Sequence, residues 1–150
     1  MHLRELRDDE LPAFLTAAQR FYVHDLIHSG GVTEEDARAK ARRDHDALFP
    51  HGRRQPGHHV LAVEDDSGTP VGRMWFAERG PTIWLYQVEI DEAHRGAGLG
   101  RAAMEALEAR ARELGATKLE LNVFGRNAVA RGLYRSLGFA EEAVHMGKPL

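Results

Sequence analysis

Residues 87–101 of the chain read QVEIDEAHRGAGLGR, and this stretch decides the fold. Its first four residues predict the end of a β-strand, its glycines predict a short loop, and the residues from position 98 onward predict the first turn of a helix. Glycine at every second position of the loop leaves few side chains over the backbone. N–H groups can then point outward beside a helix N-terminus, which carries a partial positive charge. We therefore predict a site for a phosphate or a pyrophosphate.

The spacing of these glycines excludes the two commonest nucleotide-binding motifs. Gly96, Gly98 and Gly100 form a G-x-G-x-G pattern, whereas the dinucleotide fingerprint is G-x-G-x-x-G. No Gly-Lys-Ser/Thr follows, which excludes a P-loop. The plainer alternative is a glycine turn that binds no ligand. Other motifs of the chain have to decide between a phosphate site and such a turn.

Length, charge and composition are typical of one globular domain. The 150 residues suffice for a single domain spanning 1–150, with 43% hydrophobic and 29% charged residues. The formal net charge of −3 argues against a nucleic-acid partner, and no apolar run reaches the length of a membrane span. Because the N-terminal segment is too charged for a signal peptide, a cytoplasmic location is expected.

The chain contains no cysteine. Disulfides and thiolate-bound zinc are thereby excluded, and so is a covalent intermediate on a cysteine side chain. If the protein transfers a chemical group, direct transfer between two bound substrates becomes the leading alternative.

Hydrophobic periodicity and turn residues predict strands and helices within one α+β domain. Strands are expected over 2–7, 60–64, 71–77, 83–90, 119–123 and 139–148. Helices are expected over 10–29, from Thr33 to about 48, over 98–114, and from Asn127 to Gly138, with Ser29-Gly30-Gly31 ending the first of them.

Two motifs, in this order, carry a resemblance to a known family. Residues 95–100 read RGAGLG and match the R/Q-x-x-G-x-G/A pyrophosphate motif. Residues 133–139 read LYRSLGF and match an L-Y-x-x-x-G-F signature, with Asn127 at the usual distance before it. The chain thus resembles the GCN5-related N-acetyltransferase (GNAT) superfamily, closely over 58–148 and only in layout over 1–57.

The resemblance implies an α+β fold with a mixed, twisted, mostly antiparallel central sheet, helices on both faces and a splayed, V-shaped strand pair. It also implies acetyl-CoA as cosubstrate. A β-bulge opens the strand before the glycine loop, whose backbone at Val88 and Ile90 would hydrogen-bond the pantetheine arm. The residues that would enclose the pyrophosphate are Arg95, Gly96, Ala97, Gly98, Leu99, Gly100 and Arg101.

Asn127 and Tyr134 each have a structural and a functional interpretation. Asn127 is a good helix N-cap, and the family uses this residue beside the pantetheine arm. Tyr134 could be an aromatic side chain that only packs the last helix, whereas the resemblance makes it the general acid that protonates the CoA thiolate. A phenol with a pKa of about 10 and a thiol with a pKa of about 8.5 are close enough for useful proton donation.

The general base stays open between Glu89 and a water relay. Glu89 is the carboxylate nearest in sequence to the predicted cofactor contacts. Strict strand alternation, however, would put Glu89 and Gln87 on the face opposite to Tyr86. It would put Val88 on the same face as Tyr86. Family members often have their base at the positions of Trp84, Tyr86 or Asn122 here, and none of these side chains is a good base.

His24 and His28 lie four residues apart on the first predicted helix and could share a metal ion. No obvious third ligand accompanies them, so we predict no metal site. Because this helix lines the acceptor pocket in the family, Tyr22 and both histidines are better interpreted as acceptor contacts or as ordinary surface residues.

The predicted activity is N-acetyl transfer from acetyl-CoA to an amine by direct attack in a ternary complex. A backbone amide near residues 88–90 would polarise the thioester carbonyl. The amine could belong to a small molecule or to a peptide, and acyl groups larger than acetyl are compatible with the motifs. The alternatives are a non-catalytic acyl-CoA-binding sensor of the same fold and an unrelated phosphate-binding module. A homodimer is common in the family, but no segment of this chain indicates one.

Overall fold

The computed structural model describes residues 1–28, 32–148 and 150. Its centre is a five-stranded sheet in which the spatial order of the strands follows the chain. Strands β1 to β4 pair antiparallel, and β5 lies parallel to β4. The predicted mixed, mostly antiparallel sheet of an α+β fold is therefore confirmed. The strands are β1 His2–Glu5, β2 His58–Glu64, β3 Pro70–Arg79, β4 Thr82–Ile90 and β5 Lys118–Leu121.

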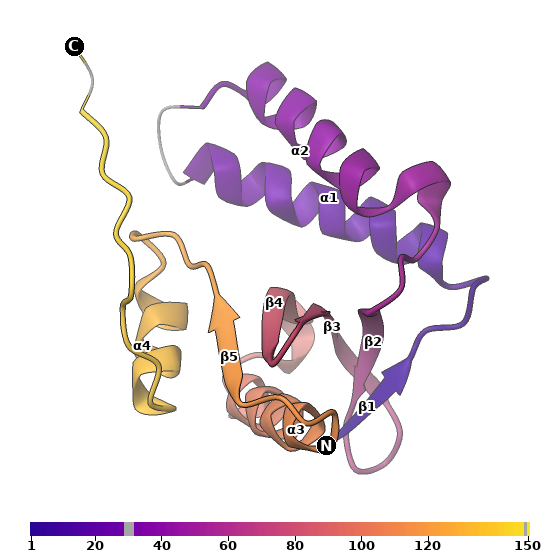
Figure 1. The fold of residues 1–150 in the computed structure, drawn as a ribbon. Coiled ribbons are helices and arrows are strands. Elements are labelled where there is room, and N and C mark those ends of the chain that lie inside the picture. The colour runs from indigo at the N-terminus through magenta and orange to yellow at the C-terminus, as the bar shows by residue number, and fades with distance from the viewer. Residues whose placement is uncertain (29–31, 149) are drawn as a thin grey trace.

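Helices cover both faces of the sheet, as Figure 1 shows. Helices α1 and α2 form a pair over one face, and α3 packs under the other, whereas α4 lies beside β5. The helices are α1 Leu11–His28, α2 Glu34–Leu48, α3 Leu99–Glu113 and α4 Ala128–Ser136, with short 3-10 turns at Pro50–Gly52 and Glu92–His94.

Each face of the sheet has its own hydrophobic core. On the α3 side, Met74, Phe76 and Leu85 pack with Met104 and Leu107 of the helix, and these side chains are almost fully buried. On the α1 side, the core consists of Leu11, Phe14, Ala18, Phe49, Val60 and Trp75. The side chain of a strand residue can therefore be assigned to a face by the core that it enters.

The predicted helix starts at Thr33 and Asn127 are confirmed. The Thr33 hydroxyl accepts the backbone N–H of Asp36 at 3.1 Å, and the Asn127 side-chain oxygen accepts that of Ala130 at 3.0 Å. These bonds satisfy backbone donors that a first helical turn leaves without partners. The predicted end of the first helix at Ser29-Gly30-Gly31 lies outside the described residues.

The prediction of a final strand over 139–148 is wrong. These residues are irregular, and their charged side chains bind neighbouring elements. Glu141 forms ion pairs with Arg131 and Arg135 of α4, and Glu142 pairs with Lys118 of β5 at 2.8 Å. Side-chain ion pairs therefore hold this segment beside α4, where the sequence pattern had suggested a backbone ladder.

No helix among the described residues is long and apolar enough to cross a bilayer.

Candidate active site

The two strands at the end of the sheet separate halfway along β4. β4 and β5 are in register only from Thr82 opposite Lys118 to Leu85 opposite Leu121. β4 then continues to Ile90 without a strand partner on that side. The resulting V-shaped opening, which the family resemblance predicted, exposes a strand edge with free backbone donors and acceptors.

A β-bulge at Tyr86 marks the point of separation. Trp75 of β3 pairs with Gln87, whereas the next residue, Phe76, pairs with Leu85, so that Tyr86 is an extra residue on β4. A bulge bends its strand and increases the local twist. The bend therefore accounts for the departure of β4 from β5 just after Leu85.

From Gln87 onward, the side chains of β4 point to the opposite faces of the sheet from those that strict alternation predicts. Residues directly opposite each other in an antiparallel pair share a face. Gln87 lies opposite Trp75, which belongs to the α1-side core, and Val88 lies opposite Met74, which belongs to the α3-side core. Tyr86 packs on the α1 side as well. The expectation that Gln87 and Glu89 face away from Tyr86 and that Val88 shares its face is therefore wrong, because strict alternation holds only without a bulge.

Glu89 consequently lies on the α1 face of the opening. Its carboxylate is 3.5 Å from Arg73 Nε and accepts a hydrogen bond from the Gln87 amide at 3.2 Å. Arg73 also binds Asp91 at 3.1 Å. One guanidinium is thus shared by two carboxylates, Glu89 and Asp91.

The glycine loop follows β4 and leads into α3. Gly96 and Gly98 adopt left-handed φ values of 82° and 78°, and Gly98 is the N-cap of α3. Within the described residues, the five successive backbone N–H groups from 96 to 100 donate no hydrogen bond to the protein. Open space surrounds Gly96 and Gly98. Free donors at a helix N-terminus are suited to an anion such as a pyrophosphate.

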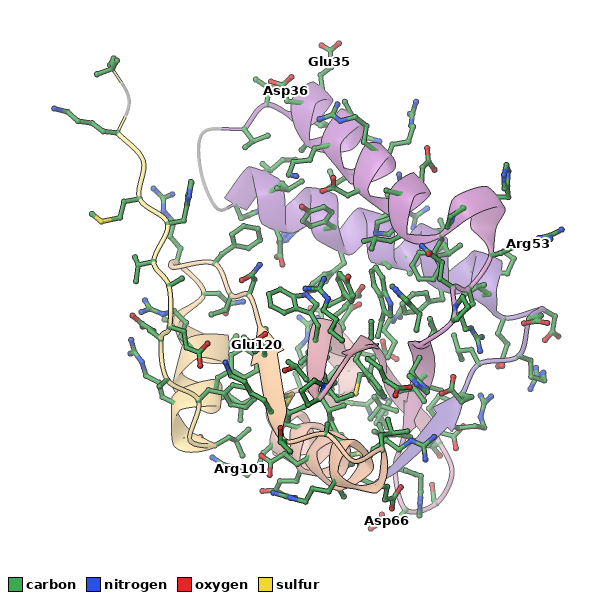
Figure 2. The ribbon with its side chains drawn as sticks, in the orientation of Figure 1. Glu35, Asp36, Arg53, Asp66, Arg101 and Glu120 are labelled. Atoms are coloured by element: carbon green, nitrogen blue, oxygen red, sulfur yellow. The ribbon has the colours of Figure 1, made fainter. Side chains whose placement is uncertain are left out.

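The two arginines that flank the loop anchor it to neighbouring elements. Arg95 Nε donates to the carbonyl oxygen of Ile90 at 2.9 Å, which ties the loop to the end of β4. Arg101, labelled in Figure 2, donates to the Ser136 hydroxyl and so ties the first turn of α3 to α4. A Cβ at Gly100 would lie 3.5 Å from Leu133, which indicates how closely α4 packs on that turn. The loop, β4 and α4 therefore form one unit.

Asn127→Ala is expected to lower the free energy of unfolding by about 1 kcal/mol, because the substitution removes the N-cap of α4. Urea unfolding measures this loss. Asn127→Asp is the matched control, since aspartate caps helices equally well and should keep the stability of the native chain. Equal stability of all three proteins would contradict the capping role.

Tyr134 lies on α4, the helix that packs on the first turn of α3. Its ring packs against the α3-side core and lies 5.7 Å from the Phe139 ring. Its hydroxyl makes no hydrogen bond to any described residue. Burial, and next the negative charge of Asp25, raise the pKa of the phenol above its ordinary value, so that the hydroxyl keeps its proton at neutral pH.

Asp25 is a partly buried carboxylate that sequence reasoning did not single out. It lies in the last turn of α1, whose C-terminal end is above the end of β5 in Figure 1. The carboxylate is 27% exposed, and burial is the main cause that raises its pKa. The available signal was its helical position three residues after Tyr22 and beside Leu26, where the inward-facing stripe of α1 ends.

His24 and His28 do not form a metal site with Asp25. The two imidazole rings stack with centroids 3.8 Å apart on the exposed side of α1. In the part of the chain that the structure describes, no three His, Cys, Asp or Glu side chains are placed to hold a metal ion.

Aromatic side chains line the α1 face of the sheet beside the bulge. Trp75 and Tyr86 stack with centroids 4.2 Å apart and an interplanar angle of 11°. Arg79 donates to the Tyr86 hydroxyl at 2.8 Å and lies 4.4 Å from the centroid of Trp84. Trp75 itself is buried, whereas Tyr86, Trp84 and Arg79 are partly or fully exposed, and these three suit the body of a bound organic molecule.

Comparisons with known proteins agree with this arrangement. Residues 20–139 match the acetyltransferase (GNAT) family. The uncharacterized N-acetyltransferase YdgE of Bacillus subtilis is 32% identical over 152 residues, which cover 99% of this chain and 97% of that protein. A mycothiol acetyltransferase of Propionibacterium freudenreichii is 30% identical over 98% of this chain, but the chain spans only 45% of that longer protein.

A solved structure has nearly the same fold. The crystal structure of the putative acetyltransferase YycN from Bacillus subtilis superposes with a TM-score of 0.93 at 30% identity and covers 99% of this chain and 98% of that one. The similarity includes the N-terminal helices as well as the strand, loop and helix around the opening.

Proposed function

This chain belongs to the acetyltransferase (GNAT) family, and on that premise we propose that it transfers an acetyl group from acetyl-CoA directly to an amine in a ternary complex. One observation supports the proposal most. The unpaired edge of β4 is followed, after the short turn at Glu92–His94, by five free N–H groups at the N-terminus of α3. An extended amide-containing arm joined to a pyrophosphate has the chemistry that this continuous edge and loop can bind.

The donor would lie along β4 with its pyrophosphate at the glycine loop. The backbone of Val88 and Ile90 would bind the pantetheine amides, although the Ile90 carbonyl already accepts from Arg95 and only its N–H is available. The loop residues from Arg95 to Arg101 would surround the phosphates, chiefly through backbone N–H groups. Asn127 would add a contact through its amide nitrogen, since its oxygen caps α4.

Bound acetyl-CoA would supply an acetyl group activated as a thioester. Backbone N–H groups near residues 88–90 would polarise the thioester carbonyl. Tyr134 would hold the proton that the departing sulfur needs, because its hydroxyl is protonated and has no other partner among the described residues. Since the chain has no cysteine, an acyl-cysteine intermediate is excluded and direct attack by the amine is the simplest route.

The acceptor would approach from the α1 face. Glu89 lies on this face, and it is one candidate for receiving the amine proton, directly or through water. Tyr86, which stacks on the buried Trp75, and the Arg79–Trp84 contact would support the rest of a small-molecule or peptide amine. The proposed acceptor is thus an amine, which a small molecule or a peptide can carry.

Acetyl-CoA at 100 times its dissociation constant is expected to stabilise the protein by about 2.7 kcal/mol. For a domain of this size the melting temperature should rise by roughly 5–10 °C, which differential scanning fluorimetry measures. ADP is the control, because it carries the pyrophosphate without the pantetheine arm and should stabilise the protein much less. The absence of a shift over a wide acetyl-CoA concentration range would contradict both an acetyltransferase and an acyl-CoA sensor.

A further inference from the structure

Arg79, the last residue of β3, is held over two aromatic rings of β4. Its Nη2 donates to the Tyr86 hydroxyl at 2.8 Å, and its guanidinium carbon lies 4.4 Å from the centroid of Trp84 and 5.5 Å from that of Tyr86. The two rings meet edge to face with centroids 6.4 Å apart. A guanidinium is attracted to the faces of such rings, and the bond to the phenol adds a fixed direction. The side chain is therefore positioned by the protein, although it is exposed.

The Arg79 guanidinium has no anionic partner among the described residues. Its only hydrogen bond there is the one to the phenol, and it takes part in no ion pair. Glu78, the preceding residue, points to the α3 face, where its carboxylate lies 2.8 Å from His59 Nε2. Glu120, on the neighbouring strand β5, accepts from Lys118 at 2.6 Å. An uncompensated positive charge therefore remains on the α1 face of the sheet.

The positive charge also acts on a neighbouring imidazole. Burial, and next the charge of Arg79, lower the pKa of His58 below its ordinary value. The Nδ1 atom of His58 accepts the indole N–H of Trp75 at 3.1 Å, and the ring stacks on Tyr86 with centroids 5.8 Å apart. A neutral imidazole can accept such a bond, whereas an imidazolium cannot. The charge of this aromatic surface at neutral pH thus comes from Arg79.

Arg79 lies at the base of the opening between β4 and β5. It pairs with Thr82 at the hairpin end of β4, and it contacts Tyr86, the extra residue of the bulge, one residue after the pairing with β5 ends. Ile90 follows four residues later, which is about 13 Å along a strand. The glycine loop lies beyond that end. The predicted donor contacts and the guanidinium are therefore on different sides of the bulge, so that this charge is suited to the acceptor and not to the phosphates of the donor.

We propose that Arg79 binds a carboxylate of the acceptor, so that the acceptor is an amine that also carries a carboxylate, namely an amino acid. The inference rests on the proposed acetyl transfer and specifies its acceptor class. A guanidinium presents parallel N–H donors that match the two oxygens of a carboxylate. Among the described residues only Nη2 has a partner, so that the donors of Nη1 and Nε are available for this contact. Because the aromatic rings already position the side chain, binding costs little rotamer entropy.

The experiment compares amino acids with amines that lack the carboxylate. Acetyl-CoA turnover is followed as free thiol with the standard amino acids, β-alanine and γ-aminobutyrate. The amide of the best acceptor is its matched counterpart, since it keeps the amine and the side chain and loses the negative charge. Phosphoethanolamine tests a phosphate in place of the carboxylate. We expect kcat/KM of the best amino acid to exceed that of its amide about 30-fold, and phosphoethanolamine to be a poor acceptor.

Arg79→Gln should remove this preference. The KM for the amino acid should rise about 30-fold with little change in kcat, because the lost contact binds a part of the acceptor that does not react. The kinetics with the amide should stay as in the native chain. A merely structural role of Arg79 would lower the turnover of both acceptors alike, so that the ratio of the two separates the roles. Arg79→Lys keeps the charge without the fork of donors and should recover part of the preference.

Arg53→Gln is the matched control. Arg53 is exposed and extends away from the molecule, far from Glu120, as Figure 2 shows. The control should leave both KM values unchanged. Turnover of no amino acid, equal turnover of an amino acid and its amide, a preference for phosphoethanolamine, or a preference that survives in Arg79→Gln would each overturn the inference. A missing thermal shift with acetyl-CoA would instead contradict the proposed function itself, so that the two failures are distinguishable.

Discussion

Tyr134→Phe is expected to lower kcat about 1000-fold while the affinity for acetyl-CoA changes little. The substitution removes only the hydroxyl, which is the proton source for the departing sulfur. The ring keeps its packing against the α3-side core and Phe139. Steady-state release of free thiol gives kcat, and titration calorimetry with acetyl-CoA gives the affinity.

The free energy of unfolding shows whether a lower kcat comes from the missing proton donor or from a disturbed fold. The Tyr134 hydroxyl has no hydrogen-bond partner among the described residues, so that its removal should leave the free energy of unfolding nearly unchanged. Tyr22→Phe is the matched control: its hydroxyl binds Asp44 at 3.0 Å, between α1 and α2. This control should lose a little stability and keep kcat. If Tyr134→Phe kept its activity, Tyr134 would be a packing residue and the acid would have to be sought elsewhere.

The raised pKa of Tyr134 adds a pH dependence to this prediction. Burial and the charge of Asp25 favour the protonated phenol, so that the acid form persists to higher pH than in a free tyrosine. Activity at alkaline pH should therefore not fall until the pH exceeds about 10, the ordinary value for a phenol.

Gly72→Ala is expected to lower the free energy of unfolding by about 3 kcal/mol. Gly72 lies in β3 opposite Ile90, and a Cβ there would be 2.2 Å from the backbone oxygen of Glu89 and 3.1 Å from the Ile90 Cα. Both contacts are with backbone of the neighbouring strand, which cannot move aside without separating β3 from β4. Urea unfolding measures the loss, and acetyl-CoA binding should weaken because the displaced residues belong to the predicted donor strand.

Gly132→Ala makes the same chemical change where nothing lies within 4 Å of the added Cβ. Gly132 is inside α4, so alanine should stabilise the protein by up to about 1 kcal/mol. Opposite signs for the two variants would tie the effect to the close approach of β3 and β4. A neutral Gly72→Ala would mean that the two strands are farther apart than the structure has them.

Local sequence was sufficient for the elements that surround the site. The glycine loop, the N-cap at Asn127 and the helix that carries Tyr134 all depend on interactions within a few residues, and all three elements form where they were predicted. The irregular segment from 139 to 148 could not be predicted in this way. Its course depends on Arg131, Arg135 and Lys118, which belong to other elements.

The face to which each β4 side chain points could not be predicted from local sequence either. Alternation along one strand is a local rule, but the bulge at Tyr86 is a property of the register between β3 and β4. One extra residue moves Glu89 to the α1 face, where it meets Arg73. No pattern within residues 82–90 alone reveals that shift, because the strand that defines the register is a separate segment.

The sequence by itself determined the family, the α+β sheet and the glycine loop with its helix, because motif order and short-range periodicity encode them. Only the tertiary structure decided which charged groups share the opening between β4 and β5. Asp25 and Tyr134 are separated by more than one hundred positions, and the Asp25 charge raises the pKa of Tyr134 only because the fold brings the two residues near each other. Burial and charge pairing depend on such distant neighbours, as Arg73 of β3 shows where it is shared by Glu89 and Asp91.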